Sequence, residues 1–255
     1  MNDSLLEIRE LSKAFGQVVT ARNLSFALEP GIITSIIGPN GAGKSTLINI
    51  LTGFIPPDSG KVVFQGRDIT YDPIDRRVRS GLCRSFQVVN VFGHLSVFEN
   101  VAIPVLAVNG NARSFLRSVK SYKGAADEVD KVLTRIGLLD KSHVPASALS
   151  HGDRRLLEVG IALAARPKLL FLDEPTAGMN PVERTKILQN IRALSTEGQV
   201  TFVIVEHDMD VVFSLSERVI VLHRREIIGD GTPEQERPIL RFARCILVRR
   251  WRRNA

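Results

Sequence analysis

The stretch GPNGAGKSTL, from Gly38 to Leu47, constrains the fold of this chain more than any other. It matches the phosphate-binding pattern Gly-x4-Gly-Lys-Ser, and it lies where that pattern requires, after an apolar strand-like run and before a helix that opens at Lys44. Its glycines let successive backbone N–H groups turn toward a triphosphate, and the start of the helix adds a favourable dipole. Lys44 is predicted to reach the β- and γ-phosphates, and Ser45 to ligate Mg²⁺. The predicted nucleotide-binding residues in this loop are Asn40, Gly41, Gly43, Lys44, Ser45 and Thr46.

A second run, KLLFLDEP, ends an apolar strand with Asp173 and Glu174. In a parallel sheet these carboxylates emerge at the C-terminal edge, which is also where phosphates bind. Surface carboxylates at a strand end are common, and only the phosphate-binding loop makes this pair informative. We expect Asp173 to bind Mg²⁺ directly or through water, and Glu174 to polarise the water that attacks the γ-phosphate.

The order of strand-like and helix-like runs predicts an α/β fold. Short β-type runs dominate the first third, residues 89–165 look helical, and apolar strands then alternate with helices from Pro181 and Met209. Apolar strands without two-residue alternation indicate a parallel sheet covered on both faces. We therefore predict a P-loop NTPase core with a parallel sheet, an antiparallel β subdomain and a helical subdomain. Residues 1–232 would form one ATPase domain, with its core at 1–88 and 166–232, its helical subdomain at 89–165, and an Arg-rich tail at 233–255.

Composition excludes several other classes. No apolar run approaches the roughly 18 residues that span a bilayer, and the first residues do not resemble a signal peptide, so a cytosolic chain is expected. Cys83 and Cys245 are too few for a disulfide framework and are predicted to be free thiols. The net charge is +7, but from Pro233 onward seven Arg and two Glu supply +5 of it. A solvated charged tail is therefore favoured over a nucleic-acid or lipid surface.

With these motifs in this order, the chain from about residue 5 to 233 resembles the ATP-binding subunit of an ABC transporter. The resemblance implies a Q-loop role for Gln87, which would sense Mg²⁺ and the attacking water, and a γ-phosphate contact for His207. Without the family resemblance, Gln87 would be interpreted as a polar loop residue and His207 as a structural residue. Phe15 falls where the family stacks an aromatic ring on adenine, although an aromatic between two strands is more often in the core.

The run LSHGD, from Leu149 to Asp153, resembles the family's signature Leu-Ser-Gly-Gly-Gln. The resemblance implies that this turn caps the γ-phosphate held by a partner subunit, so that two chains sandwich two ATP molecules; the residues acting in trans would be Ser150, His151 and Gly152. Asp153 also fits a local capping box, with Ser150 as the N-cap of the following helix. We hypothesise that Asp153 orders the turn and points away from nucleotide.

Three segments, FQVVNVFGHLSVFENV, LSHGDRRLLE and AGMNP, resemble the branched-chain amino acid importer branch, with Asn180 where many members have Asp. ATP hydrolysis coupled to import is therefore the expected function. A urea or amide importer, a lipopolysaccharide-exporter-like ATPase and a soluble ABC-type ATPase acting on ribosomes or DNA remain alternatives. The soluble class is disfavoured because this chain has one phosphate-binding loop, one signature and no sustained heptads.

The resemblance also implies ATP and Mg²⁺ as cofactors and a peripheral location at the cytoplasmic face of the membrane. Expected partners are membrane permease subunits, a second ATPase subunit (a copy or a paralogue) and, indirectly, a periplasmic or extracellular solute-binding protein; no nucleic acid is expected. Phe92 and His94 are candidates for contacting the permease, with a place in the helical core as the alternative. The tail could contact anionic lipid through Trp251 or could have no selected function.

Overall fold

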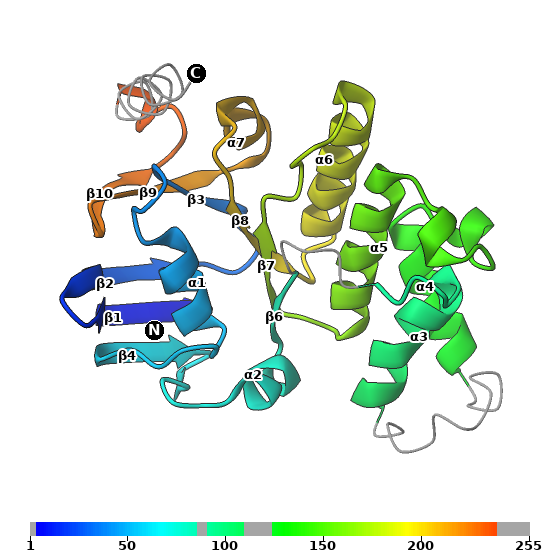
Figure 1. Cartoon of the computed structure of the whole chain (residues 1–255), viewed down its shortest axis with the longest axis horizontal. Coiled ribbons are helices and arrows are strands. Elements are labelled where there is room, and N and C mark those ends of the chain that lie inside the picture. The colour runs from blue at the N-terminus through cyan, green and yellow to red at the C-terminus, as the bar shows by residue number, and fades with distance from the viewer. Residues whose placement is uncertain (1–3, 86–90, 110–123, 239–255) are drawn as a thin grey trace. The chain divides into compact units, whose positions relative to one another are not determined.

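The computed structural model describes residues 4–85, 91–109 and 124–238 (Figure 1). The chain divides into two compact units, and helix α2 (Ile74–Ser80) contains the first boundary between them. Unit 1 is Met1–Arg77 with Thr201–Ala255, and unit 2 is Val78–Val200. Among the described residues, no helix combines the length and the apolar character needed to cross a membrane.

Unit 1 contains an antiparallel sheet of order β2-β1-β4-β5. Leu6 in β1 pairs with Leu28 in β2 and with Phe64 in β4, and all three side chains are buried. One face of this sheet therefore packs into the core, as expected for antiparallel strands with alternating burial. The strands are β1 (Leu6–Phe15), β2 (Val18–Leu28), β4 (Ser59–Phe64) and β5 (Arg67–Asp68).

The second group of strands in unit 1 follows the order β10-β9-β3-β8. Strand β3 pairs in parallel with β8 and with β9, and β10 is antiparallel to β9. Every residue of β3 and β8 is buried, which explains why their sequences lack alternation. The elements are β3 (Thr34–Ile37), α1 (Lys44–Leu51), β8 (Thr201–Val205), α7 (Met209–Leu215), β9 (Arg218–His223) and β10 (Glu226–Gly231).

In its described residues, unit 2 combines a parallel pair of strands with the helices α3 to α6. Helices α3, α4 and α5 pack on one another, and α6 packs on α5 (Figure 1). The strands are β6 (Leu82–Arg84) and β7 (Leu169–Asp173), which pair in parallel. The helices are α3 (Val97–Val108), α4 (Ala125–Arg135), α5 (His151–Ala164) and α6 (Pro181–Thr196), with short 3-10 turns at Leu139–Lys141 and Ala146–Ala148.

Local capping explains where these helices begin. Ser96 before α3 and Asn180 before α6 each form a reciprocal capping box with the Glu three residues later. Ser150 accepts a hydrogen bond from the Asp153 N–H at the start of α5. Helices predicted to open at Lys44, Pro181 and Met209 begin at those residues.

The predicted α/β class is confirmed, with parallel and antiparallel strands both present. The compact units differ from the segments predicted from the sequence, which placed residues 166–232 with the core. Residues 166–200 belong to unit 2 because β7 pairs with β6 and α6 packs on α5. The proposed ATPase domain at 1–232 remains a prediction.

Candidate functional site

The predicted phosphate-binding loop connects β3 to α1 in unit 1, and two of its glycines are required by close backbone approach. A Cβ at Gly38 would lie 2.1 Å from the Leu222 carbonyl oxygen, and one at Gly43 would lie 2.3 Å from the Thr20 carbonyl oxygen. Gly43 is also the N-cap of α1, has a φ of 103° and offers no side-chain cap. The first turn of α1 therefore presents its amides without a side-chain oxygen from the N-cap residue, as an anion-binding helix start requires.

Lys44 lies against its own loop. Its Nζ donates to the Gly38 carbonyl oxygen at 2.6 Å and to the Pro39 carbonyl oxygen at 3.3 Å. The neighbouring Ser45 is exposed and Thr46 is half-buried. The ammonium group is thus anchored at the loop where phosphates are expected.

A pocket of about 680 Å³ lies beside the tip of this loop, and Asn40 and Gly41 line it. The opposite wall includes Arg224 and Arg225, which form the two-residue turn between β9 and β10. Both arginines have positive φ, 47° and 76°, as a type I′ hairpin requires. The sequence analysis missed these cations because Arg-Arg is not a residue pair that indicates such a turn. Their positive charge favours anions in the pocket.

His207 and Phe15 also belong to unit 1. His207 follows β8, whose Val205 pairs with Ile36 in β3, so the loops after both strands leave the same sheet edge. His207 is exposed, and its N–H donates to the carboxylate of the buried Glu206 at 3.2 Å. Phe15 is 49% exposed, so it is not a core residue, and Lys13 Nζ lies 5.4 Å from its ring centroid. Its proposed stacking on adenine remains a prediction.

Asp173 and Glu174 lie at the end of β7 in unit 2. Asp173 is largely buried, and its Oδ2 accepts from Arg84 Nη2 at 2.8 Å. Arg84 ends the neighbouring strand β6 and was not predicted from the sequence, because only strand pairing brings it to Asp173. Glu174 has a φ of 45°, a left-handed conformation that costs energy for a residue with a side chain. The fold therefore holds Glu174 in a backbone conformation that residues with a side chain disfavour.

The signature turn is also in unit 2. Ser150 is the N-cap of α5, His151 is exposed and Gly152 is buried. The Gly152 N–H donates to the Glu183 carboxylate at 3.2 Å, although these residues are on different helices. Glu183 was not a predicted site residue, since its capping pattern with Asn180 gives no sign of a contact with α5.

Asp153 differs from its predicted local role. Its N–H donates to Ser150 Oγ as expected, but its carboxylate accepts instead from Lys141 at 2.6 Å and from Lys186 at 3.2 Å. Burial raises the pKa of this carboxyl, while the hydrogen bonds from the two lysines lower it and prevail. The carboxylate therefore connects the signature helix to a 3-10 turn and to α6, and not to the N-cap amide.

Two further predictions fall on the segment before α3. Gln87 lies outside the described residues. Phe92 is 61% exposed and His94 is exposed, so neither is buried in the helical core. Contact with a permease remains a prediction for both. Asn100 fixes the backbone of this segment, because its side chain bonds both the N–H and the carbonyl of Phe92.

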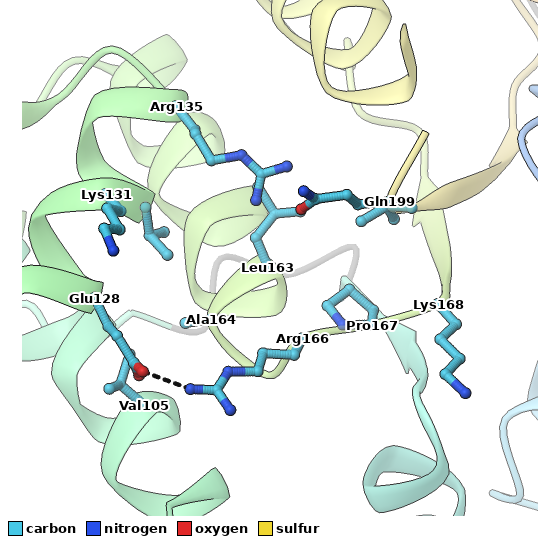
Figure 2. Close-up of a pocket in the computed structure, with 12 residues that line it drawn as sticks. Val105, Glu128, Lys131, Arg135, Leu163, Ala164, Arg166, Pro167, Lys168 and Gln199 are labelled. Carbon is cyan, nitrogen blue, oxygen red and sulfur yellow. Dashed lines mark hydrogen bonds and ion pairs between the residues drawn. The ribbon is translucent and has the colours of Figure 1, made fainter. Parts of the chain in front are cut away.

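Unit 2 also contains a pocket of about 430 Å³ with four basic residues in its lining (Figure 2). Glu128 is the acidic member and pairs with Arg166 at 2.6 Å. None of the residues predicted to act on nucleotide lines this pocket, so it is not part of the predicted site. The basic residues are Lys131, Arg135, Arg166 and Lys168.

Comparison with known proteins identifies relatives along most of the chain. The family model described as ABC transporter matches residues 21–177. The chain is 35% identical over 93% of its length to the high-affinity branched-chain amino acid transport ATP-binding protein LivG of Escherichia coli (strain K12), covering 95% of that relative. It is 33% identical, with the same coverages, to the corresponding protein BraF of Pseudomonas aeruginosa.

Solved structures agree with the sequence relatives. The ADP conformation of MJ1267, an ATP-binding cassette of an ABC transporter, superposes with a TM-score of 0.84 at 31% identity, covering 93% of this chain and 94% of that one. A nucleotide-free cassette from an ABC transporter gives a TM-score of 0.82 at 30% identity, with the same coverages.

Proposed function

Because this chain belongs to the ABC transporter family, we propose that it is the ATP-hydrolysing subunit of an importer for branched-chain amino acids. Its cassette is an ATPase of this family. The observation that carries the substrate class is the nearly full-length similarity to ATP-binding proteins named for branched-chain amino acid transport.

Residues of unit 1 would bind the triphosphate. The N-cap residue of α1 is a glycine, so no N-cap side chain bonds to the amides of the first turn. This supports a role for these amides in binding phosphate. Lys44 would exchange the Gly38 carbonyl for β- and γ-phosphate oxygens, and its ammonium would neutralise charge there. Phe15, half-exposed at the end of β1, would stack on adenine, and His207 would contact the γ-phosphate.

Residues of unit 2 would support the reaction itself. Glu174 would orient and polarise the attacking water, and its left-handed backbone is consistent with a carboxylate positioned for such a role. The Ser150 hydroxyl and the Gly152 amide would cap the γ-phosphate bound by a partner subunit. Two ATP molecules would then bring two subunits together, and hydrolysis would let them part.

The available donors fit Mg²⁺. Asp173 supplies a carboxylate and Ser45 a hydroxyl, both hard oxygen ligands, while phosphate oxygens and water complete the set that Mg²⁺ prefers. When bound, Mg²⁺ would neutralise charge on the β- and γ-phosphates. Asp173 would have to release Arg84 to ligate it directly.

The proposal includes partners. Permease subunits would carry the substrate across the membrane, and this chain would bind them peripherally at the cytoplasmic face. The exposed side chains of Phe92 and His94 support a contact near the start of α3. The second ATPase would be a copy of this chain or a paralogue, and a solute-binding protein would deliver substrate to the permease from the other side.

Uptake measurements with this chain assembled with its permease subunits test the proposal. Vesicles containing the whole complex and internal ATP should accumulate radiolabelled leucine but not urea. Glu174→Gln should abolish uptake, whereas Glu197→Gln, an equal charge change in an exposed ion pair at the far end of α6, should not. Uptake of urea without leucine would overturn the substrate class. Full leucine uptake by Glu174→Gln would remove Glu174 from its role.

A further inference from the structure

Hydrogen bonds within the chain occupy two amides of the signature turn. The Asp153 N–H donates to Ser150 Oγ at 3.1 Å, and the Gly152 N–H donates to Glu183 Oε1 at 3.2 Å. The starts of α1 and α5 therefore differ. The N-cap of α1 is a glycine without a side chain, whereas an amide in the first turn of α5 already bonds to an anionic oxygen.

The same carboxylate also organises the start of α6. Glu183 Oε2 accepts from the Asn180 N–H at 3.3 Å, and the Glu183 N–H donates to Asn180 Oδ1 at 3.0 Å. One side chain thus joins the signature turn to the capping box that begins at Asn180 within the AGMNP segment. A movement of this carboxylate would change both.

Packing around Gly152 is fitted to Glu183. A Cβ at Gly152 would lie 2.9 Å from Glu183 Cγ and 3.1 Å from Glu183 Cβ. A Cβ at Gly178 would lie 3.7 Å from His151 Cε1, so the adjacent residue of the turn also lies beside this segment. The signature turn is therefore in direct contact with Glu183 through Gly152, and His151 lies close to Gly178.

We propose that Glu183 is a positioning residue for ATP-driven closure: its carboxylate holds the Gly152 amide until the triphosphate of the partner subunit displaces it. This inference rests on the proposed function, in which Gly152 caps that phosphate. The Glu183 carboxylate accepts the hydrogen bond that the phosphate would accept, because both groups would use the Gly152 N–H as donor. Both groups are negative, so they repel at close range and cannot share the amide without cost.

Displacement of Glu183 has a consequence for Asn180. When Oε1 leaves Gly152, the carboxylate turns and its bond from the Asn180 N–H changes with it. Arrival of phosphate at the signature is thereby transmitted to the residues that precede α6. Glu183 touches neither substrate nor reacting atoms in this scheme and acts only through Gly152 and Asn180.

ATP titrations of a hydrolysis-deficient chain test the inference. In the Glu174→Gln parent, dimer formation is followed by size-exclusion chromatography with light scattering at increasing ATP concentration. Adding Glu183→Gln replaces a charged acceptor by a neutral one of the same shape, and hydrogen bonds to charged groups are roughly twice as strong. The ATP concentration at half-maximal dimerisation should fall about threefold to tenfold. The matched control Glu197→Gln should leave it unchanged.

Each result decides the question. A parent that forms no ATP-dependent dimer, either with itself or with the second ATPase subunit, would overturn the proposed function and this inference with it. A parent that dimerises, with Glu183→Gln unchanged or needing more ATP, would overturn this inference alone. In the nucleotide-free chain labelled with ¹⁵N-glycine, Glu183→Gln should move the Gly152 amide resonance and Glu197→Gln should not. An unmoved resonance would show that the amide is not held by Glu183.

Discussion

Replacement of Arg77 by Met is predicted to destabilise the chain strongly, because this side chain is 1% exposed and its guanidinium donates to four backbone carbonyls. Its guanidinium donates to the Asp72 and Thr70 carbonyls at 2.9 and 2.8 Å. It also donates to the Ile50 and Leu51 carbonyls at 2.8 and 2.7 Å. The last two are the final residues of α1, whose C-terminal carbonyls have no partner within the helix. Arg77 thus completes the helix that begins at the phosphate-binding loop.

The magnitude follows from these four bonds. Methionine fills a similar space but cannot donate, so four carbonyls lose a donor at about 1 kcal/mol or more each. Removing a desolvated charge offsets part of that loss, since burial already disfavours the charged guanidinium and lowers its pKa. The Ile50 carbonyl also keeps its bond from the Gly53 N–H, so the net decrease in the free energy of unfolding should be about 2–4 kcal/mol. The guanidinium stays protonated, so the decrease should not depend on pH between about 5 and 9.

Urea unfolding followed by circular dichroism measures this difference, with Arg76→Met as the matched control. Arg76 has a side chain that is 61% exposed and a single described ion pair, with Asp72, so its loss should cost less than about 0.5 kcal/mol. If the two variants unfolded at the same urea concentration, the buried hydrogen bonds of Arg77 would not contribute as reasoned.

Three further changes have predicted outcomes. Asp153→Asn should lower the free energy of unfolding by about 1–2 kcal/mol at neutral pH, measured by urea unfolding. Because the folded-state pKa of Asp153 is lowered, its contribution is present above about pH 4 and is lost as pH falls through that pKa, so an equal effect in strong acid would contradict it. Burial raises the pKa of the Cys83 thiol to about 11, so in a Cys245→Ser chain an aromatic disulfide reagent near neutral pH should label it only after unfolding; rapid native labelling would refute this. Arg225→Gly should raise the free energy of unfolding by about 1 kcal/mol, since a φ of 76° is strained for arginine; a less stable variant would show that its side-chain contacts matter more.

Local signals were the part of the structure that the sequence could predict. The helices begin at Lys44 and Pro181 because glycine, asparagine and proline determine backbone geometry within a few residues. The fully apolar strands β3 and β8 likewise predicted burial on both faces, which their pairing confirms. The family resemblance added roles for residues that no local pattern distinguishes, such as His207.

Contacts between distant segments could not be predicted. Arg84 reaches Asp173 only because β6 and β7 pair, and Gly152 meets Glu183 only because α5 packs on α6. The pattern around Ser150 predicted a reciprocal capping box, but two lysines from elsewhere in unit 2 compete for the Asp153 carboxylate and win. A charge within hydrogen-bond reach outweighs a local preference that contributes about 1 kcal/mol.

Lys44 and Asp173 share a property that bears on how ligands enter. Each already has a partner of opposite polarity within the chain: a backbone carbonyl at 2.6 Å for the ammonium, and the Arg84 guanidinium at 2.8 Å for the carboxylate. In the proposed function, a triphosphate at Lys44 would have to replace the hydrogen bond to the Gly38 carbonyl, and a divalent ion bound directly by Asp173 would have to replace the ion pair with Arg84. The binding free energy of such a ligand would then be the small difference between the hydrogen bonds that Lys44 and Asp173 make within the chain and those that they would make with the ligand. Both charged groups are satisfied by bonds within the chain, so substitutions that weaken either bond should make ligand binding tighter.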